Sequence, residues 1–231
     1  TLSRMAYLPG THLERRTGQW DLEKLSRFDG PKAQIFAVFC DSVLPGASRA
    51  AERQIAVFRR ECERNQDRVV PCVDASQAGQ AFADGKLAAF LSVEGAELLD
   101  CAVEKLDWAY ARGVRFINLT WNHANALSGS HCDEPERGLS GQGRDFVRRM
   151  ERLGMLPDVS HLSDAGFWDL AECTNSPIIA SHSNSRSVFF HTRNLTDEQF
   201  TAIIKKNGIV GLNCYAAFLG EGSVTMDDLR R

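Results

Sequence analysis

The sequence predicts an α/β fold, an eight-stranded (β/α)8 barrel of the TIM type, on the strength of three observations. Short apolar segments rich in β-branched residues alternate with longer segments of helical period, a pattern typical of parallel strands covered by helices. The strand segments are apolar throughout, as expected of strands that are buried on both faces. Polar residues able to bind metal recur directly after these strands, and the same end of the strands carries the catalytic groups of barrel enzymes.

Six strands are predicted in chain order: Gln34–Cys40, Ala88–Val93, Phe116–Leu119, Leu156–Val159, Ile178–Ala180 and Ile209–Leu212. A closed barrel needs two more, so we expect the first strand to lie before Thr1 and the eighth strand to lie after Arg231. An open doubly wound sheet is the alternative arrangement. The Gly-rich phosphate-binding turn that follows the first strand of nucleotide-binding open sheets is absent, which favours the barrel.

Five helices are predicted between these strands: Ser48–Asn65, Ala102–Arg112, Gly141–Leu153, Asp164–Cys173 and Thr196–Lys206. The last of them begins with Thr196 as N-cap and Gln199 three residues later, which indicates a capping box. Gly113, Gly154 and Gly208 each stand between a helix and a strand. We expect a left-handed cap at each of these glycines.

Length and composition describe an ordinary globular chain, and we expect residues 1–231 to form a single domain. The net charge is −3, with Lys and Arg scattered along the sequence, so there is no electrostatic basis for nucleic-acid binding. No apolar run approaches the roughly 20 residues of a membrane span. The seven cysteines include no CxxC pair, and we interpret them as small buried residues in a reducing, cytoplasmic compartment. Apolar helix faces would permit a homodimer.

Three strand ends carry residues that can bind a metal ion. Glu94 follows strand 88–93, Ser160-His161 follows strand 156–159, and Ser181-His182 follows strand 178–180. Taken singly, such a glutamate is often a solvated turn residue, and such a histidine is often satisfied by local backbone hydrogen bonds. Their recurrence at equivalent strand ends predicts that a carboxylate and two imidazoles meet around bound cations, a suitable hydrolytic metal site.

Other polar residues near these strand ends are open to two interpretations. His123 follows strand 116–119, where it either lines the pocket or belongs to an ordinary loop. Arg193 precedes the last predicted helix and is either a surface charge or a guanidinium that binds a carboxylate through two hydrogen bonds. We expect His12 and His131 to lie in surface loops.

Several short segments of the sequence resemble motifs of the membrane (renal) dipeptidase family of the amidohydrolase superfamily. The most specific are Ser92–Gly95, Asp158–His161, Ser181–Arg186 and Arg193-Asn194, and the resemblance extends from about Asp21 to Asn213. Trp121-Asn122, directly after Leu-Thr, resembles a bacterial branch of the family.

The resemblance implies two zinc ions in the intact protein and a role for each matching residue. Glu94 is implied as the catalytic carboxylate that bridges the zinc ions, His161 and His182 as ligands of the second zinc, and Arg193 as the residue that binds the carboxylate of the substrate. The His-x-Asp motif that holds the first zinc in the family is expected before Thr1-Leu2, and a further Asp is expected beyond Arg231.

The implied reaction is zinc-dependent hydrolysis of the peptide bond of a dipeptide through a metal-bound hydroxide. Trp121 stands where some members of the family have a histidine that contacts substrate, so the polar role passes to His123 or Asn125; we expect all three to face the substrate. Because the first pair of metal ligands is missing from the sequence, we expect residues 1–231, made alone, to be inactive.

Two alternatives remain at this point. A lactonase-like or phosphotriesterase-like amidohydrolase often uses a modified lysine on the fourth strand, and strand 116–119 has no lysine. A catalytically inactive dipeptidase-like barrel that acts as a binding or scaffold protein is compatible with the sequence. A His-x-Asp motif in the residues before Thr1 would favour the enzyme, and its absence would favour the scaffold.

Overall fold

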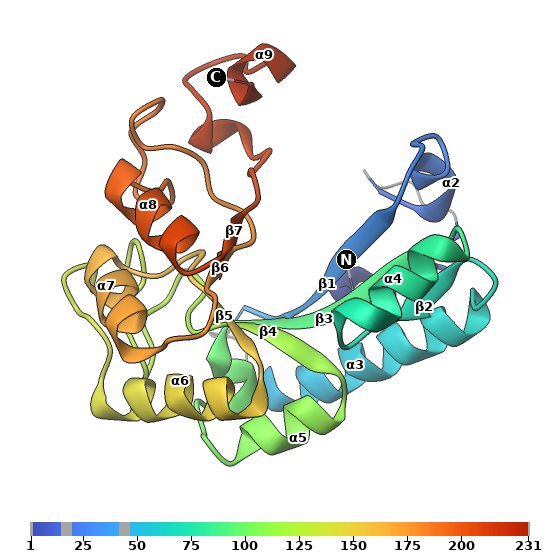
Figure 1. Cartoon of the computed structure of the whole chain (residues 1–231), viewed down its shortest axis with the longest axis horizontal. Coiled ribbons are helices and arrows are strands. Elements are labelled where there is room, and N and C mark those ends of the chain that lie inside the picture. Colours follow the sequence, from blue (N-terminus) through green and yellow to red (C-terminus); the bar gives the residue numbers. More distant parts are fainter. Residues whose placement is uncertain (1, 15–19, 42–46, 231) are drawn as a thin grey trace. The chain divides into compact units, whose positions relative to one another are not determined.

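The computed structural model describes residues 2–14, 20–41 and 47–230 (Figure 1). These residues cluster into two compact units. Unit 1 comprises the described residues within Thr1–Asp100 and Asp107–Arg115, and unit 2 those within Cys101–Leu106 and Phe116–Arg231. A single domain over residues 1–231 therefore stays a prediction. The first and eighth strands were expected before Thr1 and after Arg231. Both of these residues lie outside the described residues.

Unit 1 is built on long parallel strands. Its elements are α1 (Leu2–Tyr7), α2 (Leu22–Leu25), β1 (Lys32–Phe39), α3 (Ala47–Arg64), β2 (Val69–Pro71), α4 (Ala75–Ala83), β3 (Leu87–Glu94) and the 3-10 helix η1 (Ala96–Leu99). Strands β1 and β2 both pair in parallel with β3. Helix α3 packs on β1 and β2, and α4 packs on β3. Val38, Phe58 and Leu91 lie in the resulting core.

Strand β2 and helix α4 were not predicted from the sequence. Strand β2 has three residues and ends in Pro71, and a proline inside a short apolar run argues against a strand. Helix α4 begins after Asp74, whose side chain accepts a hydrogen bond from the backbone N–H of Gln77. Its buried face is formed by the small residues Ala78 and Ala81 and is interrupted by Gly79, so the helical period is carried by few large apolar side chains and is hard to recognise.

Unit 2 has shorter strands and longer loops. Helix α5 (Lys105–Ala111) and strand β4 (Val114–Asn118) cross the boundary between the units. They are followed by α6 (Gly141–Leu153), β5 (Leu156–Asp158), α7 (Asp164–Cys173), β6 (Ile179–Ala180), α8 (Asp197–Lys205), β7 (Ile209–Val210), η2 (Ala216–Phe218) and α9 (Met226–Leu229). Strands β4 to β7 pair in parallel in chain order, which confirms the prediction of a parallel α/β fold.

Most helix ends agree with the prediction to within one residue, but α5 begins at Lys105 rather than at the predicted Ala102, and one of the three predicted glycine caps is absent. Thr196 and Gln199 form the predicted capping box of α8, and Gly113 and Gly154 have the predicted positive φ. At the third position the prediction is wrong, because Asn207 adopts the left-handed conformation with φ of 56°. A Cβ on Gly208 would lie 1.9 Å from the carbonyl oxygen of Ile178, so this glycine is needed for close approach of the backbones.

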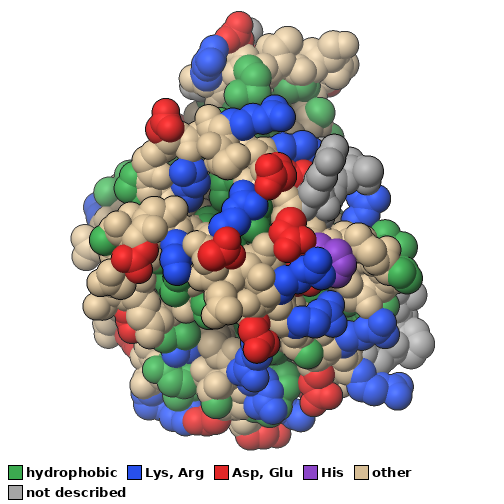
Figure 2. All heavy atoms as spheres, turned by 90° about the vertical axis from the view of Figure 1, so that its right-hand side faces the viewer, with side chains coloured by type: hydrophobic (Ala, Val, Ile, Leu, Met, Phe, Trp, Pro, Cys, Tyr) green, Lys and Arg blue, Asp and Glu red, His purple; other side chains and the backbone are tan. Residues whose placement is uncertain are grey.

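The surface and the cysteines add three observations. On the face drawn in Figure 2, Lys and Arg side chains are interspersed with Asp and Glu side chains. No helix among the described residues is long and apolar enough to cross a membrane. All seven cysteines are described and free; three of them are buried, whereas Cys132 and Cys214 are exposed. Burial raises the pKa of the Cys62 thiol to about 12. The prediction that the cysteines are buried is wrong for Cys132 and Cys214.

Candidate metal centre

Two of the predicted metal ligands, His161 and His182, face each other in unit 2. Their Nε2 atoms lie 2.8 Å apart, and the ring centroids are separated by 4.9 Å. His161 follows the end of β5 by three residues, and His182 follows the end of β6 by two. Because β5 and β6 are parallel neighbours, their carboxyl ends meet at the same edge of the sheet. The local convergence of these two imidazoles is what the strand-end pattern predicted.

A buried aspartate joins the two strand ends. Asp158 is 2% exposed, and its Oδ1 accepts hydrogen bonds from the backbone N–H groups of Ser160 at 3.0 Å and Ser181 at 3.1 Å. The hydroxyl of Ser160 in turn accepts a bond from the backbone N–H of His182 at 3.2 Å. Side chains therefore take over from the backbone ladder where the regular strands stop, and they fix the spacing of both histidines.

His161 has a constrained backbone. Its φ is 78°, in the left-handed region that few non-glycine residues adopt and that is frequent at functional sites. Its carbonyl oxygen accepts hydrogen bonds from the backbone N–H of His131 at 2.9 Å and from the hydroxyl of Thr120 at 3.3 Å. The loop after β4 thus holds His161 in a conformation that would otherwise be unfavourable.

The second nitrogen of each ring is occupied by a neighbouring side chain. Nδ1 of His161 lies 3.1 Å from Oδ1 of Asn122, and Nδ1 of His182 lies 2.7 Å from the hydroxyl oxygen of Ser181. Both Nε2 atoms are therefore directed toward the shared space between the rings. Metal-binding histidines in proteins are commonly oriented in this way by a polar partner on the other nitrogen.

His131, which we expected in a surface loop, lies beside this pair. Its Nε2 is 3.1 Å from Oδ1 of Asn122 and its Nδ1 is 3.0 Å from the hydroxyl of Thr192. Burial lowers the pKa of His131 to about 3, and the positive charge of Arg193 and the nearby His191 act in the same direction. His131 lies in a loop, as predicted, but its side chain is half-buried against neighbouring polar residues rather than free on the surface. His12 lies in unit 1, where its Nδ1 is 3.1 Å from Oε1 of Glu61.

Arg193 also lies next to the histidine pair. It is 3% exposed, and its guanidinium donates hydrogen bonds to the carbonyl oxygen of His182 at 3.1 Å and the hydroxyl of Ser183 at 3.4 Å. The guanidinium carbon lies 5.5 Å from the centre of the Phe218 ring. A small hollow is lined by both His161 and Arg193. Of the two interpretations of Arg193, the surface charge is therefore wrong.

The three residues predicted to face the substrate have different surroundings. The Trp121 ring lies 6.2 Å from the His161 ring and 5.9 Å from the His123 ring, centre to centre. Asn125 supports its own loop, since it donates to the carbonyl oxygen of Leu119 at 2.7 Å and accepts from the backbone N–H of Leu127 at 2.9 Å. Contact of these residues with substrate stays a prediction.

Glu94 belongs to the other unit. It is the last residue of β3, is half-buried, and stands in register with Phe39 of β1. Its predicted role as bridging ligand therefore also stays a prediction. Glu94, Trp121 and His123 had predicted roles, whereas Asn122, Ser181 and Asp158 had none. In the sequence these residues could be recognised only by their position just after the predicted strands, because loop residues follow no periodicity.

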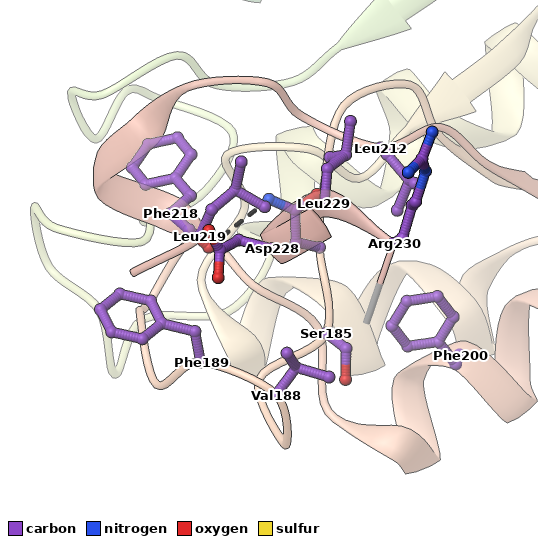
Figure 3. A pocket seen from close by; sticks show the side chains of 11 residues that line it. Ser185, Val188, Phe189, Phe200, Leu212, Phe218, Leu219, Asp228, Leu229 and Arg230 are labelled. Atoms are coloured by element: carbon purple, nitrogen blue, oxygen red, sulfur yellow. Dashed lines mark hydrogen bonds between the residues drawn. The ribbon is translucent and has the colours of Figure 1, made fainter. Parts of the chain in front are cut away.

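Unit 2 also contains a mostly apolar cavity of about 280 Å³ that none of the predicted site residues lines. Figure 3 shows its walls, which come from the loop that contains Val188 and Phe189, from Phe200 of α8, and from the last described segment of the chain. Phe218 belongs to this wall and also covers the guanidinium of Arg193. The cavity and the arginine therefore share one aromatic side chain.

Comparison with known proteins finds one family over nearly the whole chain. The sequence profile described as membrane dipeptidase, peptidase family M19, matches residues 3–230. An uncharacterized dipeptidase from Schizosaccharomyces pombe is 37% identical over 185 residues, which are 76% of this chain and 44% of that protein. The chain spans between 44% and 64% of the length of the first curated relatives that it matches.

Two solved structures have the same fold at higher coverage. Dipeptidase AC, a metallopeptidase of family M19, is 26% identical with a TM-score of 0.89, and the match covers 99% of this chain and 75% of that one. A metallopeptidase from Rhodobacter sphaeroides, solved with a phosphinate mimic of the dipeptide L-Ala-D-Ala, is 26% identical with a TM-score of 0.85. That match covers 100% of this chain and 74% of the other.

Proposed function

The chain belongs to the membrane dipeptidase family, and on that premise we propose that it carries part of a zinc-dependent site that hydrolyses the peptide bond of dipeptides. The observation that supports this most directly is the pair of Nε2 atoms 2.8 Å apart, with each Nδ1 bonded to another side chain. A dipeptide substrate is supported by the relative that was solved with a dipeptide mimic.

The donor set suits a metal of zinc type. Imidazole nitrogens and carboxylate oxygens are common zinc ligands, and two nitrogens on one tetrahedral zinc with Zn–N of about 2.0–2.1 Å lie about 3.3 Å apart. The observed separation of 2.8 Å approaches this value, and a small shift of either ring supplies the difference. In the proposal His161 and His182 hold the metal together with Glu94. When bound, zinc supplies Lewis acidity and makes a coordinated water more acidic.

The remaining residues of the proposed site position the substrate. Arg193 binds the free carboxylate of the dipeptide, since a guanidinium presents five N–H donors in a planar fork that matches a carboxylate. Its fixed place beside His182 would set the distance between that carboxylate and the scissile bond, and so restrict the substrate to short peptides. Trp121, His123 and Asn125 border the substrate in this proposal.

The test measures zinc content and dipeptide cleavage on the protein at its natural length. We expect His161→Ala and His182→Ala to lose both, and we expect chelation to stop cleavage and added zinc to restore it. His12→Gln, in unit 1, is the control and should retain both properties. A dipeptide whose terminal carboxylate is amidated should be cleaved far more slowly, because Arg193 then has no carboxylate to bind.

Two outcomes would contradict the proposal. Cleavage that persists in His161→Ala, or after complete removal of metal, would show that these histidines do not form the hydrolytic centre. A wild-type protein with neither zinc nor cleavage would favour the non-catalytic scaffold.

Cytoplasmic location and a homodimer belong to the same proposal. The seven free cysteines support a reducing compartment, although two of them are exposed. Cell fractionation tests the location, and light scattering of the purified protein tests the dimer.

A further inference from the structure

Asn122 contacts two histidines through a single atom. Its side-chain oxygen Oδ1 lies 3.1 Å from Nδ1 of His161 and 3.1 Å from Nε2 of His131. A side-chain carbonyl oxygen can accept two hydrogen bonds but can donate none. Both facing ring nitrogens must therefore carry a proton, and this requirement selects one tautomer of each neutral imidazole.

The selected tautomer of His161 is the one that a metal ligand needs. With its proton on Nδ1, a neutral His161 has a lone pair on Nε2, the atom that faces His182. We propose that Asn122 is a positioning residue that holds His161 in this ligand-ready tautomer before any metal arrives. This inference rests on the proposed metal function of the pair, but the tautomer itself exists independently of that function.

Asn122 acts within a loop that is itself tied to His161. Nδ1 of His131 lies 3.0 Å from the hydroxyl of Thr192, which can donate to it, and the backbone N–H of His131 donates to the carbonyl oxygen of His161. Together with the bond from Thr120 to the same carbonyl oxygen, the loop restrains both the ring and the strained backbone of His161. His131 thus keeps the oxygen of Asn122 directed toward the metal centre.

His182 has a different kind of partner. The hydroxyl of Ser181, 2.7 Å from Nδ1 of His182, can either donate or accept a hydrogen bond. Without metal, the lone pair on Nε2 of His161 can accept a hydrogen bond only if Nε2 of His182 carries a proton. The hydroxyl of Ser181 can then donate to Nδ1 of His182. In the ligand form the proton is on Nδ1 of His182, and this N–H donates a hydrogen bond to the hydroxyl oxygen of Ser181. One histidine is therefore preset, and the other can switch tautomer without a change in its total number of protons.

The first experiment determines the tautomers in the metal-free wild-type protein. Nitrogen-15 NMR separates protonated from unprotonated ring nitrogens, and it is recorded at about pH 8, above the ordinary histidine pKa of about 6.5. We expect His161 to carry its proton on Nδ1 and His131 on Nε2. A proton on Nε2 of His161 would mean that the amide of Asn122 has the opposite orientation, and it would overturn the inference whether or not the protein binds zinc.

The second experiment measures zinc affinity by competition with a chelator in two variants at the same position. Asn122→Leu removes the acceptor at similar volume, and we expect about 10–100-fold weaker zinc binding and a mixture of His161 tautomers. Asn122→Asp keeps an acceptor oxygen and should retain the Nδ1–H tautomer and zinc affinity near that of the wild type. Asn175→Leu, an exposed asparagine in the same unit, is the control.

The results separate the inference from the proposed function. Wild-type affinity in Asn122→Leu would overturn the inference while leaving the metal centre intact. If the wild type binds no zinc, the proposed function fails, and the tautomer of His161 in the metal-free protein still decides the role of Asn122. If Asn122→Leu does not fold, the wild-type spectrum and Asn122→Asp decide, and loss of the Nδ1–H tautomer in Asn122→Asp would overturn the inference.

Discussion

The two units use different means to hold parallel strands together. In unit 1, β1 and β3 pair over eight residues, from Lys32 opposite Leu87 to Phe39 opposite Glu94. In unit 2, β5 has three residues and β6 and β7 have two each, and side chains such as Asp158 and Ser160 bond the strand ends. Regular strands favour an apolar core, whereas early termination leaves polar side chains to position the histidines.

The contrast predicts that unit 1 responds most strongly to loss of apolar packing. Leu91 is 1% exposed and stands opposite Phe36 in the long ladder. Leu91→Ala should lower the free energy of unfolding by about 2–5 kcal/mol, because it removes buried methyl groups and leaves a cavity. Denaturant unfolding measures the change.

The matched control is Phe28→Ala in the same unit, where the side chain is 67% exposed. It should change the free energy of unfolding by no more than about 0.5 kcal/mol. A loss below about 1 kcal/mol in Leu91→Ala would mean that apolar packing is not what stabilises unit 1.

Unit 2 should respond instead to loss of a buried acceptor. Asp158→Ala leaves the backbone N–H groups of Ser160 and Ser181 without their acceptor oxygen, which should cost about 1–3 kcal/mol. It should also weaken zinc binding, because the spacing of His161 and His182 depends on these bonds. Asp158→Asn keeps an oxygen at this position and should lose less of both. Equal effects of the two substitutions would show that acceptor geometry is unimportant there.

The same contrast explains what the sequence could predict. Helices α6 and α7 were predicted to the residue, because each has a side-chain cap and, in α6, a glycine at the end. The histidine pair was predicted because parallel strands bring their carboxyl ends to one edge. These are consequences of local periodicity and of sheet geometry.

Other features depend on the path of a loop or on close approach. The contact of Asn122 with His161 joins residues 39 positions apart, and no period of the sequence encodes it. The role of Gly208 depends on the carbonyl of Ile178 across the sheet. The sequence does not reveal this contact, and the position of the glycine between a helix and a strand therefore predicted a helix cap. The half-buried position of His131 follows from contacts with Asn122 and Thr192, which belong to two different loops.

The smallest effect is expected at the surface of unit 2. Arg186 donates hydrogen bonds to both carboxylate oxygens of Asp164 at 2.7 and 2.8 Å, and these bonds hold the pKa of Asp164 below its ordinary value. A carboxyl group with a depressed pKa in the folded state stabilises the protein above its unfolded pKa of about 3.9. That stabilisation is lost as the pH falls through the lower, folded pKa.

Asp164→Asn should therefore cost less than about 1 kcal/mol at neutral pH, because the Asp164 side chain is 52% exposed and solvent screens the pair. Below about pH 4 the variant should lose less stability with falling pH than the wild type does, as measured by denaturant unfolding. In an Arg186→Gln background the same substitution should have almost no effect, because the ion pair is already gone. If Asp164→Asn lost stability at low pH to the same extent as the wild type, the exposed ion pair would contribute nothing to the stability of unit 2. Polar stabilisation of unit 2 would then come from buried groups such as Asp158, which would sharpen the contrast with unit 1.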